Sequence, residues 1–378
     1  MTDTREYIQE HSSELVDLIK TLCRIPAPSN KEEKRAAFVR EWFKKQCGPV
    51  DVYIDEALNV VCRVNYSPGA FVSVFMAHTD TVFPDLAPFE PEERDGRLYC
   101  PGVGDDTANL ALLMLAARYV LTRKIPSEEG VLFVANAGEE GLGNLKGCRK
   151  LMEEYAGRVK QLVSFDGRLG NLVNRAVGSR RYRVRLAAQG GHSFSCFGNT
   201  NAIHLLSKLI ADLYSVTPPS CPGGPTTYNV GSVTGGTSVN TIAETAEMLY
   251  EYRSTDREGL AFMEREFREA VERHRAAAKS LEVEFLGERP CTGDLDPIAQ
   301  GALEQKAEDL IRAVIGKDPE KHAASTDCNI PLSQGIPAIS LGGYYGEGAH
   351  RRDEFIELAS LPKGFELVLG LILRCMEG

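Results

Sequence analysis

The chain has 378 residues, more than twice the roughly 150 residues of one average domain, so we expect two domains or one domain with a large insertion. Hydrophobic residues make up 43% and charged residues 25% of the chain, a composition that excludes a disordered or fibrous protein. The 53 acidic residues outnumber the 43 basic residues and give a net charge of −10, which argues against nucleic acid and anionic membranes as partners.

The sequence indicates neither a targeting segment nor a membrane span. Segment 1–15 mixes charges of both signs without an apolar stretch. The longest apolar run, 110–117, is far shorter than the ~20 residues that cross a bilayer. Ten cysteines are scattered from Cys23 to Cys375 without a C-x-x-C pair, which fits neither a disulfide scaffold nor a thiolate zinc site. We therefore expect a cytoplasmic protein with reduced cysteines.

Strand-like and helical runs alternate in the first part of the chain. Apolar residues at helical spacing predict one helix over 5–23, which Pro26 and Pro28 end. A helix-like run follows at 109–121, and the strand-like runs are 71–78, 130–136 and 160–166. This alternation is typical of an α/β fold with a buried, largely parallel sheet, in which ligands bind at the carboxyl ends of the strands.

The pattern changes after Gly178 into the order β-α-β-β-α-β, which predicts a ferredoxin-like α+β domain. Its elements are strand 180–189, helix 202–214, strands 226–233 and 244–253, helix 259–278 and strand 281–286. From about residue 296 the α/β pattern returns, with helix 298–316, strand 336–343 and helix 361–376. We predict a mixed, largely parallel sheet between helices in a discontinuous domain, 1–177 and 293–378. An inserted α+β domain, 178–292, interrupts it.

Metal-capable side chains follow each of the first three predicted strands. His78 and Asp80 follow the first, Glu139 and Glu140 the second, and Asp166 the third. In extended backbone His78 and Asp80 point to one face, so Asp80 can accept one imidazole N–H while the other nitrogen binds a metal. Taken singly, H-T-D also fits a hydrogen-bonded pair at a strand end, and Asp166 fits a turn before Gly167.

Two adjacent carboxylates, Asp105 and Asp106, precede the apolar helix in the motif PGVGDD. One of them can cap the helix, but capping does not explain both. The nearby Gly102 and Gly104 indicate a tight backbone path that aims a side chain. Because Thr107 stands where a dinucleotide-binding loop has its third glycine, we reject that interpretation.

Glu139 and Glu140 diverge in extended backbone, so a divided role is natural: one binds metal and the other faces a bound water. An acidic pair in a loop is otherwise often solvated. His350 lies in a glycine-rich loop, with Glu354 four residues later, and a lone loop histidine is often simply exposed. Imidazole and carboxylates together suit zinc or similar divalent ions, and two ions ~3.5–4 Å apart need one shared carboxylate. No G-x-S-x-G motif occurs, so covalent catalysis has little support.

Six motifs occur in one order: MAHTDTV, PGVGDD, NAGEEG, SFDG, GGHS and GGYYGEGAH. In these motifs the chain resembles the two-zinc exopeptidase and deacylase family that includes peptidase T, the bacterial glutamate carboxypeptidases and succinyl-diaminopimelate desuccinylase. The resemblance covers nearly the whole chain. It implies a catalytic domain of the zinc exopeptidase type and an inserted domain that serves as a lid and in dimerisation.

The resemblance also implies roles for individual residues. The ligands that it implies are His78 and Asp166 for one metal, Glu140 and His350 for the other, and Asp105 as the bridge. Glu139 becomes the general base and Asp80 orients a ligand. Beyond the ligands, His192 in QGGHS matches a histidine that stabilises the oxyanion, often from the partner subunit. Asn240 and Arg253 match positions that contact polar groups of the substrate, although each also fits an ordinary surface role.

Two departures from the family pattern refine these expectations. The lysine that commonly follows the bridging aspartate is absent, since Thr107, Ala108 and Asn109 follow Asp106. Asp166 stands where deacylases and carboxypeptidases of the family tend to have glutamate, which favours the peptidase T branch.

We therefore expect a metal-dependent exopeptidase that hydrolyses short peptides, of the aminopeptidase or tripeptidase type. It would hold two divalent ions, zinc first and cobalt or manganese as alternatives. Its partners would be a short peptide or an acylated amino acid, and a second copy in a homodimer formed through the inserted domain. The alternatives are an N-acyl amino acid deacylase with the same centre and, less favoured, a non-catalytic binding protein.

Overall fold

The computed structural model describes residues 2–377, which divide into two compact units. Unit 1 combines the chain up to Ala176 with the chain from Gly293 onward, and unit 2 is Val177–Thr292. The sheet of unit 1 therefore contains strands from both sides of the insertion. None of the described helices is long and apolar enough to span a bilayer.

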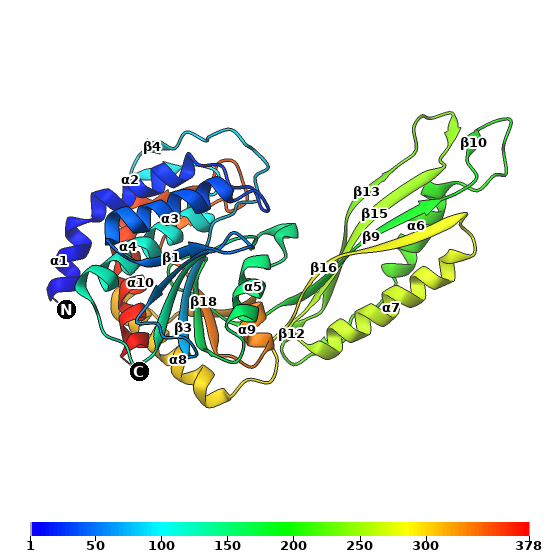
Figure 1. Cartoon of the computed structure of the whole chain (residues 1–378). Helices are drawn as coiled ribbons and strands as arrows, with labels where there is room; N and C mark the ends of the chain where they lie inside the picture. Colours follow the sequence, from blue (N-terminus) through cyan, green and yellow to red (C-terminus); the bar gives the residue numbers. More distant parts are fainter. Residues whose placement is uncertain (1, 378) are drawn as a thin grey trace. The chain divides into compact units, whose positions relative to one another are not determined.

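An eight-stranded sheet forms the centre of unit 1, in the order β1-β2-β6-β3-β7-β18-β8-β17 (Figure 1). Its four middle strands run parallel: β6 (Gly130–Asn136), β3 (Val72–His78), β7 (Val159–Phe165) and β18 (Ala338–Leu341). The outer strands are β1 (Asp51–Ile54), β2 (Val60–Val64), β8 (Asn171–Ala176) and β17 (Glu320–Ala324). The pairs β1–β2, β2–β6 and β18–β8 are antiparallel, so the predicted mixed, largely parallel sheet is confirmed.

Helices cover both faces of this sheet. Successive residues of a strand point to opposite faces, and along β3 Phe75 enters one hydrophobic core while Met76 enters another. The first core contains side chains of α4 and α10, and the second contains side chains of α5 and α9. The helices of unit 1 are α1 (Thr2–Glu10), α2 (Ser12–Cys23), α3 (Glu33–Cys47), α4 (Asn109–Arg123), α5 (Lys146–Glu154), α8 (Pro297–Ile315), α9 (Asn329–Ser333) and α10 (Leu361–Met376).

The prediction of one helix over 5–23 is wrong, because α1 ends at Glu10 and α2 begins at Ser12. At the break, His11 Nδ1 lies 2.8 Å from the carbonyl oxygen of Tyr7, and Ser12 Oγ donates to the carbonyl of Ile8 at 2.6 Å. Such local bonds from side chains to the backbone compete with the regular helix pattern. The apolar periodicity continues across the break, and for this reason it did not reveal the interruption.

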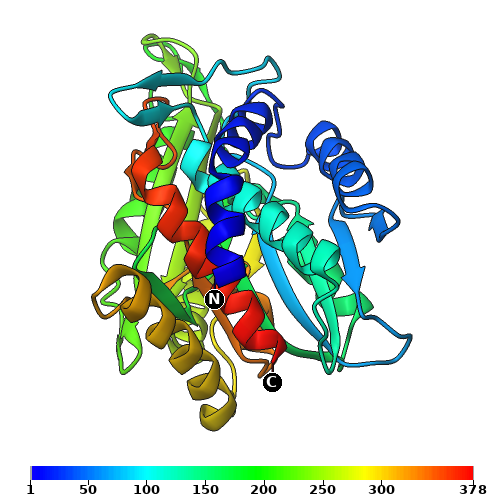
Figure 2. The same ribbon diagram turned by 90° about the vertical axis from the view of Figure 1, so that its left-hand side faces the viewer.

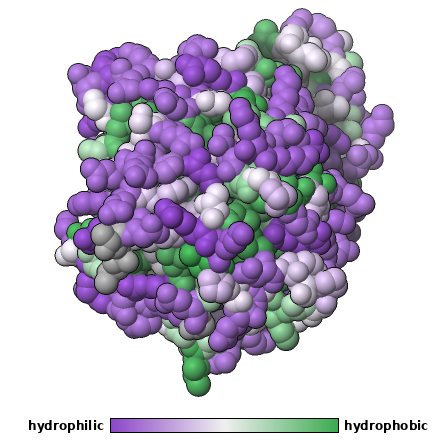
Figure 3. All heavy atoms as spheres, turned by 60° about the vertical axis from the view of Figure 1, so that its left-hand side comes forward, coloured by the Kyte–Doolittle hydropathy of each residue, from purple (hydrophilic) through white to green (hydrophobic). Residues whose placement is uncertain are grey.

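The first and last helices of unit 1 pack side by side (Figure 2). The ring centroids of Tyr7 on α1 and Phe365 on α10 lie 6.0 Å apart in an edge-to-face arrangement, a favourable geometry for aromatic rings. In the view of Figure 3 hydrophilic residues cover most of the surface and hydrophobic residues show in scattered areas. Tyr7 and Ile8 of α1 and most apolar side chains of α10 belong to the first hydrophobic core.

A small sheet in unit 1 joins the loop that carries His350 to the segment that leads to Asp105. Its order is β19-β20-β5-β4, with β19 (Gly346–Glu347), β20 (Phe355–Glu357), β5 (Arg97–Tyr99) and β4 (Glu92–Arg94). Because β20 pairs with β5, the chain that enters β20 lies beside the chain that leaves β5. This pairing holds the loop that carries His350 against the loop that carries Asp105, although the two are far apart in the sequence.

Unit 2 is a four-stranded antiparallel sheet packed with two helices. The sheet order is β13-β15-β9-β16. Along the chain, the elements are β9 (Gly178–Ala187), α6 (Ala202–Leu213), β13 (Thr227–Gly235), β15 (Thr245–Ser254), α7 (Arg257–Arg275) and β16 (Ser280–Arg289). The predicted ferredoxin-like arrangement is confirmed. Two short pairings accompany the sheet: β10 (Gly191–His192) with β14 (Thr241–Ile242), and β11 (Ser220–Cys221) with β12 (Gly224–Pro225).

Candidate metal centre

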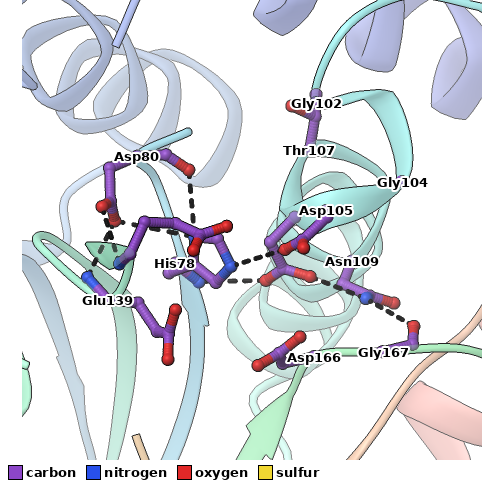
Figure 4. Close-up of polar contacts among 12 residues, drawn as sticks. His78, Asp80, Gly102, Gly104, Asp105, Thr107, Asn109, Glu139, Asp166 and Gly167 are labelled. Carbon is purple, nitrogen blue, oxygen red and sulfur yellow. Dashed lines mark hydrogen bonds and ion pairs between the residues drawn. The ribbon is translucent and has the colours of Figure 1, made fainter. Parts of the chain in front are cut away.

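The candidate site lies at the carboxyl ends of three neighbouring parallel strands of unit 1. His78 is the last residue of β3, Glu139 and Glu140 follow β6, and Asp166 follows β7 directly. Because parallel strands end at the same edge of a sheet, their terminal side chains meet there. In Figure 4 the side chains of His78, Glu139 and Asp166 converge with that of Asp105 on one space.

The loop after β5 delivers Asp105 to this space, and Glu354 holds the loop. The Glu354 carboxylate accepts the backbone N–H groups of Gly102, Gly104 and Asp105, each at 2.8 Å. Gly102 has a φ of 72°, in the left-handed region that favours glycine. A Cβ atom at Gly104 would lie 2.6 Å from the ring of Tyr344, so a side chain there would clash. The loop conformation therefore depends on both glycines and on Glu354.

Asp105 and Asp106 have different surroundings although they are adjacent. One oxygen of Asp105 lies 2.9 Å from His78 Nε2, and the other lies 3.1 Å from His350 Nε2. Asp106 instead accepts the backbone N–H of His78 at 3.0 Å and the side-chain amide of Asn109 at 2.7 Å. Asp105 is thus the carboxylate that lies between two histidines. Asp106 instead holds the backbone of His78 and the side chain of Asn109 in place.

The described residues contain three overlapping sets of possible ligand atoms, two of which share Asp105. In each set all atoms lie within 4.8 Å of one another. The first set is His78, Asp105, Asp106 and Asp166, and the second is Asp105, Glu140 and His350. A further set consists of His78, Glu139 and Glu140. The structure therefore brings together all five side chains that the sequence analysis named as metal ligands.

Asp80 contacts His78 differently from the sequence expectation. His78 Nδ1 lies 3.0 Å from the main-chain carbonyl oxygen of Asp80 and 3.6 Å from its carboxylate. The carboxylate accepts the backbone N–H groups of Glu139 and Glu140, both at 3.0 Å, and the hydroxyl of Ser29 at 2.7 Å. Because those donors occupy the carboxylate, the main-chain carbonyl is the closer acceptor for the imidazole. Asp80 also fixes the backbone of both glutamates.

The donor chemistry of the site fits divalent cations. Burial, followed by the charge of Asp105, raises the pKa of Asp166 to about 7. Hydrogen bonds to Asp105 and Glu140 raise the pKa of His350 to about 11. The Asp166 shift reflects burial together with a neighbouring carboxylate, and the His350 shift reflects two carboxylates beside the imidazole, so the cluster carries negative charge that a cation would offset. Carboxylates and imidazoles are ligands that zinc and similar ions take, so the residues present fit two such ions.

His192 lies at the surface of unit 2, in the short strand β10. Its Nδ1 accepts the backbone N–H groups of Phe194 and Ser195 at 3.3 and 3.4 Å. A neutral imidazole that accepts at Nδ1 carries its hydrogen on Nε2. The ring of His192 is therefore prepared to donate a hydrogen bond from Nε2.

The other two predicted substrate contacts also lie in unit 2. Asn240 is exposed. Its backbone carbonyl accepts the backbone N–H of Ser193 at 3.0 Å, so Asn240 lies beside the segment that carries His192. Arg253 is half-buried, and two of its nitrogens donate to the carboxylate of Glu251 at 3.0 and 3.1 Å. Asn240 thus lies with His192, while Arg253 already has a carboxylate partner in its own unit.

Sequence reasoning missed several residues that support the site. Glu354 was noted only for its place four residues after His350, and Asn109 only as a departure from a family pattern. Arg35 carried no local signal at all. It is buried, and it donates at 2.8 to 3.1 Å to the carbonyls of Leu22, Ile25 and Thr79, the last lying between His78 and Asp80. These residues bind backbone groups far away in the sequence, which no motif records.

Two histidine–carboxylate sets that share one aspartate, at the carboxyl ends of parallel strands, fit a dinuclear metal centre of the kind that metal-dependent hydrolases use. The sequence pattern of peptidase family M20/M25/M40 matches residues 74–374, and the chain belongs to this family. It is accordingly a hydrolase that acts on peptide or amide bonds.

Individual relatives agree with this assignment. The chain is 28% identical over 319 residues to a succinyl-diaminopimelate desuccinylase of Xanthomonas campestris pv. campestris, a match that covers 78% of this chain and 81% of the relative. Among solved structures it is similar to aminopeptidase PepT from Bacillus cereus, with a TM-score of 0.70 and 24% identity over 96% of this chain and 98% of that chain. A tripeptidase from Staphylococcus aureus gives a TM-score of 0.75 and 22% identity over 97% and 99% of the two chains. At these identities the two structures show a shared fold.

Proposed function

We propose that this chain is an exopeptidase that releases the amino-terminal residue of a short peptide, of the aminopeptidase or tripeptidase type. The observation that carries the proposal is the position of Asp105, whose two carboxylate oxygens face His78 and His350 from two adjoining ligand sets. The fold likeness to PepT and to a tripeptidase supports this branch of the family.

The proposed ligands are His78, Asp105 and Asp166 for one ion, and Asp105, Glu140 and His350 for the other. We propose zinc, with cobalt and manganese as alternatives, because imidazole and carboxylate donors suit all three. Two bound ions would supply an acidified water and a polarised amide carbonyl.

Glu139 is the proposed general base. It is 5% exposed and belongs to the same cluster as His78 and Glu140. The carboxylate of Asp80 accepts its backbone N–H, which keeps the residue at the edge of the ligand cluster. Glu139 would take a proton from the attacking water and pass it to the nitrogen of the departing amine.

His192 is the proposed oxyanion stabiliser, because its Nδ1 is held as an acceptor and Nε2 remains the donor. We propose that it acts from the partner subunit of a homodimer formed through unit 2, which would then serve as a lid. Asn240, and Arg253 after release from Glu251, are proposed contacts for polar groups of the substrate.

We also propose a cytoplasmic location. All ten cysteines are unpaired as thiols, and seven of them are buried. This usage suits a reducing compartment, in which disulfides are rare.

A substrate panel tests the proposed reaction. Free-amino tripeptides would be compared with N-acetyl and N-succinyl amino acids, in the presence of zinc, cobalt or manganese. Turnover of the tripeptides is the expected result. Turnover of acylated substrates alone would replace the proposal with the deacylase alternative, which the 28% identity to a desuccinylase favours. A purely binding role has less support, because every proposed ligand and the proposed base are chemically competent residues.

A further inference from the structure

A cavity of about 400 Å³ lies in unit 1 and includes Asp105 in its wall. The rest of the wall comes from the turn that follows Asp166, from the start of β8 and from the segment between β18 and β20. A molecule in this cavity therefore lies next to the side chain that both ligand sets share. Nothing in the reaction proposed above uses the cavity.

Most charged groups in the wall already have partners. Asp105 faces two histidines, and Glu354 accepts three backbone N–H groups. Arg351 donates two nitrogens to the carboxylate of Asp353, at 2.9 and 2.6 Å. These groups are occupied in holding the loops and the ligand cluster together.

Arg168 is the exception among the basic residues of the wall. Within residues 2–377 its guanidinium makes a single hydrogen bond, to the carbonyl oxygen of Gly346 at 3.4 Å. At that distance the hydrogen bond is weak. The side chain is exposed, so a positive charge without a carboxylate partner borders the cavity.

The backbone on both sides of Arg168 is fixed. The carbonyl of Gly167 accepts the side-chain amide of Asn109 at 3.1 Å, and the backbone N–H of Leu169 donates to the carbonyl of Tyr344 at 2.8 Å. Leu169 itself is buried. The turn is thus anchored to Asn109, at the start of α4, and to Tyr344, after the end of β18, so the backbone that carries Arg168 is fixed at the edge of the cavity.

We propose that this cavity is a carboxylate-binding subsite in which Arg168 recognises an acidic group of the substrate. The inference rests on the proposed function, since the acidic group would belong to the molecule whose amide bond is cut. A guanidinium binds a carboxylate through two parallel N–H donors, and Asn171 adds a neutral amide to the same wall. Arg253 already donates two hydrogen bonds to Glu251. Arg168 has no carboxylate partner, so its guanidinium is the one available to bind a carboxylate of the substrate.

Glu347 lies in the same wall, is exposed and opposes a second negative charge. Its charge therefore weakens the binding of a carboxylate beside Arg168. Replacement of Glu347 with glutamine should strengthen the preference for acidic substrates by a few fold, while loss of Arg168 should weaken it.

The test uses matched substrates that differ by one carboxylate. The pairs are a tripeptide and its carboxyl-terminal amide, tripeptides with amino-terminal glutamate or glutamine, and N-succinyl and N-succinamoyl forms of one amino acid. The pair that responds identifies whether the acidic group is the carboxyl terminus, a side chain or an acyl group. Variants Arg168→Ala, Arg168→Lys and Glu347→Gln would be compared with Arg5→Ala, which changes an exposed arginine 3.6 Å from Glu366 on the surface of unit 1.

In one of these pairs the wild-type enzyme should prefer the acidic member. Arg168→Ala should lower the acid-to-amide ratio of kcat/KM by about 10- to 100-fold, the range of a charge-assisted hydrogen bond. Arg168→Lys should restore part of the ratio, because it keeps the charge and loses the two-pronged geometry. Arg5→Ala should keep the wild-type ratio. An unchanged ratio in Arg168→Ala, or equal turnover of acid and amide by the wild-type enzyme in every pair, overturns the proposal.

A binding measurement keeps this result separate from the proposed reaction. Calorimetry with glutarate and its monoamide on the metal-loaded protein should show tighter binding of glutarate, with the difference reduced in Arg168→Ala. If no peptide or acyl substrate is hydrolysed, the proposed function fails, and glutarate binding still decides the subsite. Equal affinity of wild type and Arg168→Ala for glutarate rejects it.

Discussion

The candidate residues of unit 1 are mostly buried and bonded to one another, whereas those of unit 2 are exposed or half-buried. His78, Glu139 and Glu140 are each 6% exposed or less. His192 and Asn240 are exposed and contact mainly the backbone of their own segment. Buried ionisable groups are costly unless they are paired or bind ions, so their accumulation in unit 1 indicates a chemical centre. Because His192 and Asn240 are exposed, any catalytic or binding partner of their side chains comes from outside unit 2.

Metal removal is expected to have the largest effect and to act on unit 1. A chelator should abolish hydrolysis completely, because the clustered carboxylates then lose the ions that generate the nucleophile. Addition of zinc, cobalt or manganese should restore activity. Far-ultraviolet circular dichroism would show whether the fold survives chelation. Full activity in chelator, with metal content confirmed as zero, contradicts a metal-dependent reaction.

Glu139→Gln should reduce kcat by about 10²- to 10⁴-fold, since the amide cannot take a proton from water. Metal content should stay at the wild-type level, because Glu139 is not among the proposed ligands. Glu56→Gln is a suitable control, as Glu56 is exposed and pairs with Lys150 at 3.0 Å. Unchanged turnover in Glu139→Gln would remove Glu139 from the mechanism.

His192→Ala should lower kcat by about 10²- to 10³-fold if His192 stabilises the oxyanion. His204→Ala, which changes an exposed histidine of α6 in the same unit, should have no such effect. Mixing His192→Ala with Glu139→Gln should restore some activity, because a hybrid dimer combines an intact base with an intact histidine from the partner. Failure of this rescue, with subunit exchange demonstrated, would favour action within one chain.

Glu354→Gln is expected to act more weakly, through the loop that carries Asp105. The amide has one oxygen for three N–H donors, so the loop should loosen and metal affinity fall by about 10- to 100-fold. Competition with a metal-sensitive dye would measure the change. Glu357→Gln alters a half-buried carboxylate of β20, which lies 3.7 Å from Arg97, and should leave the affinity close to wild type. Equal affinities for both variants would show that Glu354 does not position Asp105.

The family resemblance could indicate the ligands because each belongs to a short motif, and three of these motifs stand at the ends of strands. His78, Glu140 and Asp166 follow apolar runs, and the parallel arrangement of those runs brings them together. Glu354 and Arg35 could not be assigned in this way, since their partners are backbone groups distant in the sequence. The contact from Glu354 to Gly102 spans 252 residues. Only the folded chain shows such contacts.

The same distinction applies to the helices and to Asp80. Apolar periodicity placed α4, α6 and α8 within a few residues, but it could not show the break at His11, which depends on two local hydrogen bonds. The alternation of strand residues correctly brought His78 and Asp80 together. It could not show that the carboxylate of Asp80 is occupied by backbone N–H groups from the loop after β6.

Anomalous diffraction at the zinc absorption edge, from crystals of the zinc-loaded protein, tests the central claim most directly. The shared position of Asp105 predicts two peaks, each about 2.0–2.2 Å from one of its carboxylate oxygens. One peak should also adjoin His78 and Asp166, and the other Glu140 and His350. A single peak, or peaks that do not contact Asp105, would contradict a centre of two ions bridged by this aspartate.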